Sequence, residues 1–160
     1  PALMRLDLAG LVQEVLEGER LEAGEQPVEF VAAVPPATMV RADSEQLYRV
    51  LTNLVRNARQ ALAASSAPGR IEVDAVETDT EWRITVADNG PGLPRKARAN
   101  LFRPFEAGVR KGGSGLGLVI SQELIRGHGG DLELGDSGDS GTVFVIRLPR
   151  SNAVQEQAAQ

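Results

Sequence analysis

Apolar residues recur at helical spacing over residues 44–63. An apolar residue stands at every third or fourth position, which is typical of an amphipathic helix with one face in a core. The apolar positions are Leu47, Val50, Leu51, Leu54, Val55, Ala58, Ala61 and Leu62. Asp43 or Ser44 stands where the first turn needs a side-chain acceptor, so either residue can cap this helix.

The rest of the chain divides into shorter helices and strands by the same reasoning. Helical spacing and terminal glycines predict three further helices, over 6–19 with Asp7 as its cap, over 94–102 and over 117–127. Alternating or continuous apolar runs predict five strands, over 28–34, 70–77, 81–88, 131–134 and 142–149. A short turn near residues 78–80 is expected to join two of these strands in a hairpin.

This order of elements predicts a two-layer α/β sandwich. Consecutive hairpins favour a mixed, mostly antiparallel sheet of about five strands, with three main helices on one face. A doubly wound parallel sheet fits poorly, because strands and helices do not alternate. The 160 residues suffice for one domain, which we expect over residues 1–150. Residues 151–160 lack periodicity and are expected to form a disordered tail.

Composition narrows the classes of partner. The formal net charge of −5 argues against nucleic acid, because duplex-binding proteins normally carry a basic surplus. The absence of cysteine excludes disulfides and thiolate metal sites. No apolar run reaches the roughly 18 residues of a membrane span, so we expect no direct membrane contact in this chain. We expect a cytoplasmic domain, in a full-length protein that could be anchored in the inner membrane.

Two asparagines stand out on the predicted helix 44–63. Asn53 and Asn57 are four residues apart, so both project from one side, beside the apolar stripe. Asparagine is a poor residue for a helix interior, because its side chain competes with the backbone. The pair therefore predicts either amide ligands at the edge of a cleft or an ordinary solvated helix edge.

Two glycine-containing segments are further candidates. Asp88 ends an apolar strand and is followed by Asn89-Gly90-Pro91-Gly92, which suits either a carboxylate reading a planar base or an Asx-turn. GGSGLGL (112–118) opens a helix, where glycines let phosphate oxygens approach free N–H groups. It matches neither the Walker loop nor the dinucleotide motif, and a flexible loop is the alternative.

Five segments together resemble one family of nucleotide-binding domains. In chain order they are RADSEQLYRVLTNLVRNARQAL (41–62), VADNGPGLP (86–94), LFRPF (101–105), GGSGLGL (112–118) and GTVFVIRLP (141–149). They resemble the N, G1, F, G2 and last glycine boxes of the ATP-binding catalytic domain of bacterial sensor histidine kinases, a fold shared with gyrase-type ATPases. The resemblance covers about residues 6–149 and is strongest to the branch that includes the nitrogen-regulation kinases.

The resemblance implies a site for ATP and Mg²⁺. By similarity, Asn57 is the Mg²⁺ ligand, and Asn53 faces the phosphates or the metal one turn earlier. Asp88 would accept a hydrogen bond from the adenine amino group, with Thr142 nearby through water. The remaining residues implied in binding are Gly90 and Gly92 beside the base, and Gly113, Gly115 and Gly117 beside the triphosphate, together with Leu116 and Leu118.

The resemblance also implies a reaction. Residues 106–112 correspond to a lid in which Arg110 and Lys111 would neutralise charge on the γ-phosphate, or else form a solvated basic pair. Related ATPases that hydrolyse ATP have a Glu four residues before the metal-binding Asn, and here that position is Asn53. This implies transfer of the γ-phosphoryl group to a histidine on a separate dimerisation domain, and then to the receiver domain of a response regulator. His128 is expected to cap a helix.

Two departures leave alternatives open. Gln60 stands where many relatives have Lys or Arg, with Arg56 as a candidate substitute, and the lid EAGVRKGG lacks the Thr-Thr-Lys of many relatives. The chain could therefore be a catalytically degenerate nucleotide-sensing module. It could also be a serine-directed kinase of the anti-sigma-factor type, which acid lability of the phosphorylated product would distinguish.

Overall fold

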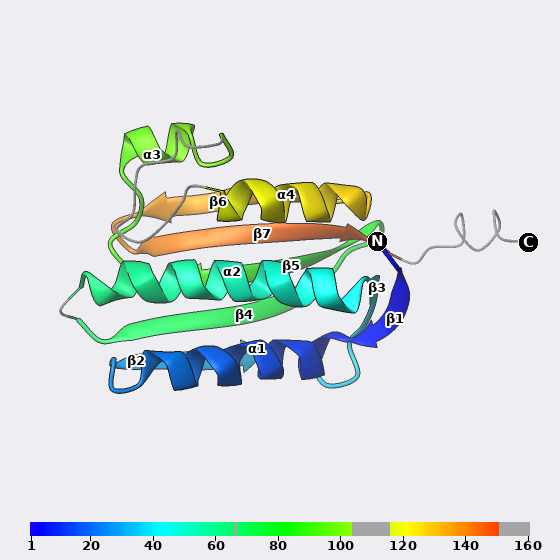
Figure 1. The fold of residues 1–160 in the computed structure, drawn as a ribbon, viewed down its shortest axis with the longest axis horizontal. Coiled ribbons are helices and arrows are strands. Elements are labelled where there is room, and N and C mark those ends of the chain that lie inside the picture. The colour runs from blue at the N-terminus through cyan, green and yellow to red at the C-terminus, as the bar shows by residue number, and fades with distance from the viewer. Residues whose placement is uncertain (66, 104–115, 151–160) are drawn as a thin grey trace, which may run out of the picture.

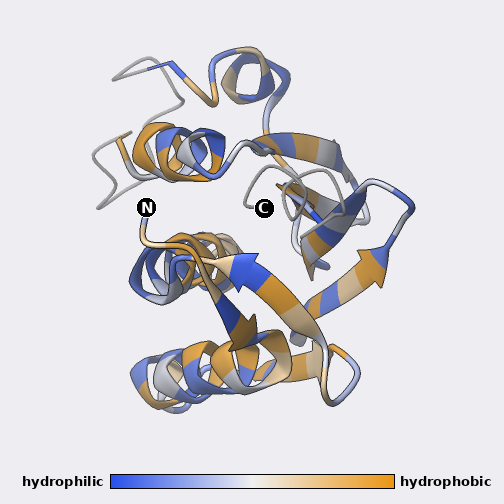
Figure 2. Ribbon diagram, turned by 90° about the vertical axis from the view of Figure 1, so that its right-hand side faces the viewer, coloured by the Kyte–Doolittle hydropathy of each residue, from blue (hydrophilic) through white to orange (hydrophobic). Residues whose placement is uncertain are grey.

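The computed structural model describes residues 1–65, 67–103 and 116–150 (Figure 1). Three helices lie on one face of a five-stranded sheet: α1 (Leu8–Ala23), α2 (Ser44–Ala63) and α4 (Gly117–Gly127). The strands follow the order β2 (Val28–Ala33), β4 (Gly69–Glu77), β5 (Glu81–Asp88), β7 (Gly141–Pro149) and β6 (Asp131–Gly138). Figure 2 shows the helix layer and the sheet layer from the side. The predicted two-layer sandwich is confirmed.

The sheet is mixed, as the hairpin pattern predicts. β2 and β4 pair in parallel, and the other three neighbouring pairs in this sheet are antiparallel. Parallel strands need a crossover, and α2 lies in the connection from β2 to β4. The turn at residues 78–80 joins β4 and β5 in the predicted hairpin. β5 and β7 pair antiparallel, so the last residue of β5 lies beside the start of β7, with Asp88 directly opposite Thr142.

The apolar stripe of α2 forms the centre of the core. All but one of its predicted apolar positions are buried: Leu47, Val50, Leu51, Leu54, Val55, Ala58 and Leu62. Alternate residues of the central strands pack under the helices, as in Ile84 and Val86 of β5. The carboxylate of Asp43 accepts a hydrogen bond from the Gln46 N–H at 3.0 Å, which confirms Asp43 as the cap. Asp7 precedes α1 without capping it through its side chain.

The largest differences from the predicted elements lie near the N-terminus and in β6. A two-stranded ribbon, β1 (Met4–Asp7) with β3 (Met39–Ala42), was not predicted. α1 begins after β1 and is longer than expected. β6 continues past Leu134 through an irregularity to Gly138, because the DSG segment still pairs with β7. The helix expected over 94–102 is shorter in the structure, where it is α3 (Arg95–Ala99).

Residues outside the described ranges include much of the predicted phosphate loop and lid. Arg110, Lys111, Gly113 and Gly115 fall there, as does the predicted tail over 151–160. None of the helices in the described ranges is long and apolar enough to cross a membrane.

Candidate functional site

Asn53 lies in the contact between α2 and the start of α4. Its amide Nδ2 donates to Ser121 Oγ at 3.2 Å, and Ser121 is buried. A Cβ atom at Gly117 would lie 2.6 Å from Asn53 Oδ1, so the side chain of Asn53 occupies the space beside the first residue of α4. Glycine at position 117 therefore lets the helix start approach α2. In α-helices generally, the first few N–H groups lack partners within the helix.

α2 continues from this contact to the turn that follows β5. Near its end, Leu62 Cδ2 lies 3.4 Å from the position that a Cβ atom at Gly90 would take. Asn57 stands between these two contacts along the helix, one turn after Asn53 and on the same side. One helix therefore links the start of α4 to the end of β5, with Asn57 in between.

The turn after β5 is held by hydrogen bonds at both of its first residues. Asp88 Oδ1 accepts the Gly90 N–H at 2.9 Å, which is the Asx-turn that the sequence left as an alternative. Asn89 Oδ1 accepts the Arg70 N–H at 2.7 Å and ties the turn to β4. A carboxylate has two oxygens and about four acceptor sites, so an Asx-turn leaves Asp88 able to accept from a ligand as well.

Two glycines allow the backbones around Asp88 to approach each other. Gly141 has φ +129°, and a Cβ atom there would lie 1.8 Å from the carbonyl oxygen of Asp88. Gly92 has φ +80°, and its Cβ atom would lie 2.2 Å from the carbonyl oxygen of Gly138. Only glycine suits either position, because both the dihedral angle and the space exclude a side chain.

A pair of buried hydroxyl groups lies beside Asp88. Thr142, its cross-strand neighbour, has Oγ1 at 3.0 Å from Ser137 Oγ. Ser137 Oγ also accepts the Leu93 N–H at 2.8 Å, which joins the turn after β5 to the β6–β7 hairpin. Sequence reasoning missed Ser137 because DSGDSG reads as a loop, and it missed Ser121 because a single hydroxyl has no periodic pattern. Thr142 was predicted.

Three other predicted residues contribute to the fold at the two ends of α4 or in the core. Leu118 packs against the core, and Leu116 precedes α4 as its N-terminal flanking residue. His128 ends α4 as predicted, with Nε2 accepting the Asp43 N–H at 3.0 Å and Nδ1 donating to the Leu124 carbonyl at 2.7 Å. The backbone N–H groups of Gln46 and then Ala2 hold the pKa of the Asp43 carboxyl below its ordinary value.

Arg56, the candidate substitute for a missing cation, lies on the α1 side of α2. Its guanidinium contacts Glu19 at 3.1 Å, and Arg59 contacts the same carboxylate at 3.0 Å. Glu19 is 2% exposed, so this carboxylate depends on its two cations within the helix layer. Arg56 is thus engaged between α1 and α2, away from the contact with α4.

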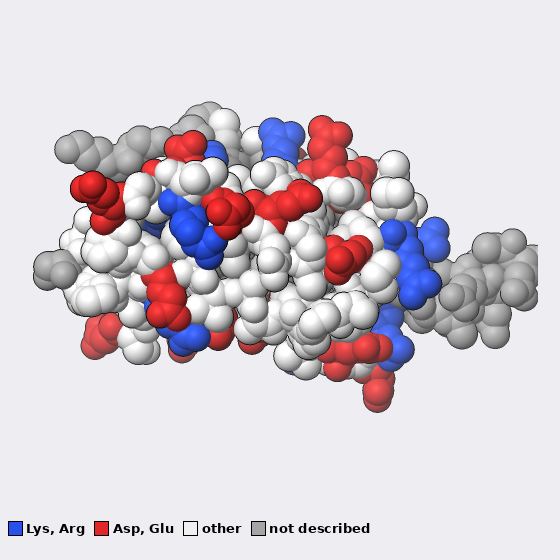
Figure 3. All heavy atoms as spheres, turned by 90° about the horizontal axis from the view of Figure 1, so that it is seen from below, with Lys and Arg blue, Asp and Glu red and all other residues white. Residues whose placement is uncertain are grey.

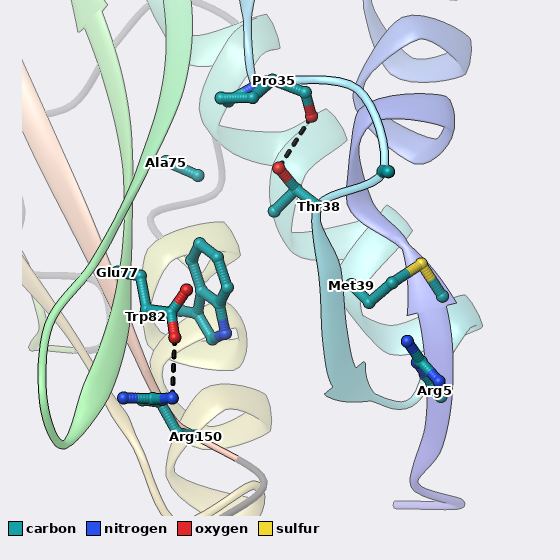
Figure 4. Close-up of a pocket in the computed structure, with 9 residues that line it drawn as sticks. Arg5, Pro35, Thr38, Met39, Ala75, Glu77, Trp82 and Arg150 are labelled. Carbon is teal, nitrogen blue, oxygen red and sulfur yellow. Dashed lines mark hydrogen bonds and ion pairs between the residues drawn. The ribbon is translucent and has the colours of Figure 1, made fainter.

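A hollow of about 580 Å³ lies at the opposite end of the sheet (Figure 4). Its walls include Trp82, Met39 and the Glu77–Arg150 ion pair, whose charged atoms are 2.8 Å apart. Trp82 stands six residues before Asp88 on β5, which corresponds to roughly 20 Å along an extended strand. None of the residues predicted for binding lines this hollow.

The described surface adds two observations about charge. On the side of α1 and β2, acidic and basic side chains are interspersed (Figure 3). Within the described ranges, no group of three or more His, Asp or Glu side chains could hold a metal ion.

Comparison with known proteins places this geometry in a family. The family described as "Histidine kinase-, DNA gyrase B-, and HSP90-like ATPase" matches residues 42–152. The C4-dicarboxylate transport sensor protein DctB of Rhizobium meliloti is 35% identical over 145 residues, covering 88% of this chain and 23% of the relative. The nitrogen regulation protein NtrY of Azorhizobium caulinodans is 33% identical over 141 residues, covering 86% of this chain and 18% of the relative.

Solved structures of histidine kinases have the same fold as this chain. The catalytic domain of histidine kinase ThkA superposes with a TM-score of 0.79 at 27% identity, covering 94% of this chain and 99% of that one. Full-length ShkA, solved in complex with AMPPNP, gives a TM-score of 0.81 at 32% identity, covering 95% of this chain and 32% of that one. The chain spans about a fifth of the length of the curated relatives named above. The chain belongs to the histidine kinase-, DNA gyrase B- and HSP90-like ATPase family, as an ATP-binding catalytic domain of the sensor histidine kinase type.

Proposed function

We propose that this domain binds Mg-ATP between α2, the start of α4 and the turn after β5, and donates the γ-phosphoryl group to a histidine on a separate dimerisation domain. One observation carries the proposal: α2 contacts the start of α4 at Asn53 and the turn after β5 at Leu62, with Asn57 between them. A base at one contact and phosphates at the other would span this length of the helix.

The base belongs at the Asp88 end. The carboxylate of Asp88 accepts a hydrogen bond from the adenine amino group, and the hydroxyl of Thr142, directly across the ladder, contacts the ring through water. Gly90 and Gly92 let the chain pass the edge of the base without side chains in the way. ShkA, which resembles this chain in fold and sequence, was solved with the ATP analogue AMPPNP.

The phosphates belong at the start of α4. The first N–H groups of the helix and the positive end of its dipole favour an anion there, and Gly117 lets the helix start lie against Asn53. Asn57 offers its carboxamide oxygen to Mg²⁺, whose remaining ligands would be phosphate oxygens and water. Bound Mg²⁺ would supply charge neutralisation for the transferred group. Asn53 holds the helix start through Ser121 and Gly117, and Arg110 and Lys111 are assigned to the lid by similarity alone.

The chemistry proposed is transfer to a protein acceptor. Asn53 stands where hydrolysing relatives have a Glu, and a carboxamide cannot act as a general base toward water. His128, the only histidine, is buried and uses both ring nitrogens in hydrogen bonds, so it is unsuited to receive the phosphoryl group. The acceptor histidine is therefore assigned to the dimerisation domain of the kinase, and the next acceptor to the receiver domain of a response regulator.

Calorimetric titration with AMPPNP, with and without Mg²⁺, tests the binding step. Asp88→Asn should lower affinity about 10- to 100-fold, because it removes a charge-assisted hydrogen bond and leaves the adenine amino group poorly paired. Glu77→Gln, at the other end of the sheet, is the matched control and should leave affinity unchanged. The transfer step is tested with a longer chain that includes the dimerisation domain, which should form an acid-labile phosphoprotein. No binding by the wild-type domain, or an acid-stable product, would contradict the respective step.

A further inference from the structure

The hydroxyl pair beside Asp88 allows two orders of donors. A backbone N–H can only donate, so Leu93 N–H occupies one acceptor site of Ser137 Oγ at 2.8 Å. The Thr142 hydroxyl lies 3.0 Å from the same oxygen, and either hydroxyl could be the donor between them. Ser137 and Thr142 are only 6% and 5% exposed, so a hydroxyl proton without an acceptor would be costly at either residue.

The surroundings favour one of these two directions. If Thr142 donated to Ser137, Ser137 would accept two hydrogen bonds, and its own proton would need a further acceptor that no recorded contact of this hydroxyl in the described residues supplies. If Ser137 donates to Thr142, the Thr142 proton is left on the side of its cross-strand neighbour Asp88, where the base of the proposed nucleotide would lie. With the order Leu93 N–H to Ser137, then Ser137 to Thr142, the one hydroxyl proton of this pair without a recorded acceptor among the described residues is that of Thr142, and a bound base or water on this side can accept it.

We infer that Ser137 is a positioning residue that makes Thr142 a hydrogen-bond donor and thereby selects adenine over 6-oxopurines. This inference rests on the proposed function. The edge of adenine presents an amino donor beside a ring-nitrogen acceptor, so it fits an acceptor at Asp88 next to a donor at Thr142, directly or through one water. Hypoxanthine and guanine present a carbonyl acceptor beside an N–H donor. They would place oxygen against the carboxylate and N–H against a donor.

Ser137 also has a mechanical role that the test must separate. Its carbonyl accepts a hydrogen bond from Arg98 Nη1 at 3.0 Å, and its hydroxyl holds the turn after β5 through Leu93. A general loosening of this region would weaken binding of every purine nucleotide together. A change in the direction of the Thr142 proton would instead change the preference between nucleotides. The informative measurement is therefore the ratio of the affinities for an adenine nucleotide and a 6-oxopurine nucleotide.

The experiment measures calorimetric affinities for ATP and for inosine triphosphate, which carries hypoxanthine. The wild-type domain should prefer ATP, and Ser137→Ala should reduce that preference about three- to tenfold, the worth of about one hydrogen bond. Ser137→Thr keeps the hydroxyl and should retain the preference. Ser137→Cys, nearly the same shape with a weak donor, should shift it in the same direction as Ser137→Ala, and it serves if the alanine variant does not fold.

Two controls decide the interpretation. Arg98→Ala removes the contact to the Ser137 carbonyl without touching the hydroxyls, and it should leave the ratio unchanged. Thr142→Val should lower the ratio on its own, and adding Ser137→Ala to it should have little further effect, because both act through one proton. Equal losses for both nucleotides in the Ser137 variants, or additive effects in the double variant, would overturn the inference. Failure of the wild-type domain to bind ATP would instead overturn the proposed function.

Discussion

The two ends of strand β5 differ in what they offer a ligand. At the Trp82 end there is a hollow of about 580 Å³, walled by the loop before β3, by Arg5 and Met39 of the β1–β3 ribbon and by the Glu77–Arg150 ion pair. At the Asp88 end, backbones approach so closely that side chains are excluded at Gly92 and Gly141, and two hydroxyls are buried. The proposed nucleotide end is therefore the one with close backbone approach and ordered polar groups, and it is not the end with the open hollow.

The largest effect that tests this contrast concerns stability at the Asp88 end. Gly141→Ala should destabilise the fold by about 3 kcal/mol or more, because it adds overlap with the Asp88 carbonyl to an unfavourable φ of +129°. Gly138→Ala, in the same hairpin, has open space around its new Cβ and should change stability by about 0.5 kcal/mol or less. Urea unfolding of both variants measures the difference. Similar free energies of unfolding for the two variants would show that the close approach of Gly141 to the Asp88 carbonyl is not needed for stability.

A smaller effect is expected at the start of α4, and it should appear in affinity. Gly117→Ala places a methyl group against the Asn53 amide and breaks its hydrogen bond to Ser121, which should shift the helix start and weaken AMPPNP binding about three- to tenfold. Gly127→Ala is the control at the other end of the same helix. Its new Cβ would meet Pro1 at an ordinary 3.9 Å, and binding should be unchanged. Equal affinities in the two variants would show that the contact between Asn53 and the start of α4 does not affect binding at the proposed phosphate site.

The elements that follow from local signals could be predicted from the sequence, and those that depend on distant pairing could not. α2 was predicted to the residue because a strong apolar stripe and the Asp43 cap agree locally. The ribbon of β1 and β3 was missed, because each strand has four residues and their pairing spans the whole of α1 and β2. Period-two patterns cannot identify such short segments.

The sequence predicts where the candidate residues lie along the elements better than it predicts what their side chains contact. Helical spacing placed Asn53 and Asn57 on one side of α2, but it could not show that Asn53 faces Gly117 and Ser121. Ser121 is 68 residues away along the chain, and such a contact depends on how the helices pack. Ser137 was hidden in a segment that reads as a turn yet continues the ladder of β6.

The smallest expected effect belongs to the end of α2 that is remote from the proposed nucleotide site. Hydrogen bonds from the N–H groups of Gln46 and then Ala2 lower the pKa of Asp43 in the folded state below its unfolded value of about 3.8. The stabilisation from this carboxylate is therefore fully present above that value and is lost as the pH falls through the folded pKa. Asp43→Asn should cost little at neutral pH, since Asn is also a good cap, while its acid-induced loss of stability below about pH 4 should be shallower than that of the wild type. Urea unfolding at pH 7 and near pH 3 measures both, and AMPPNP affinity at pH 7 should not change. An equally steep acid limb in the variant would show that Asp43 does not set it, and a fall in affinity would show that the two ends of α2 are coupled.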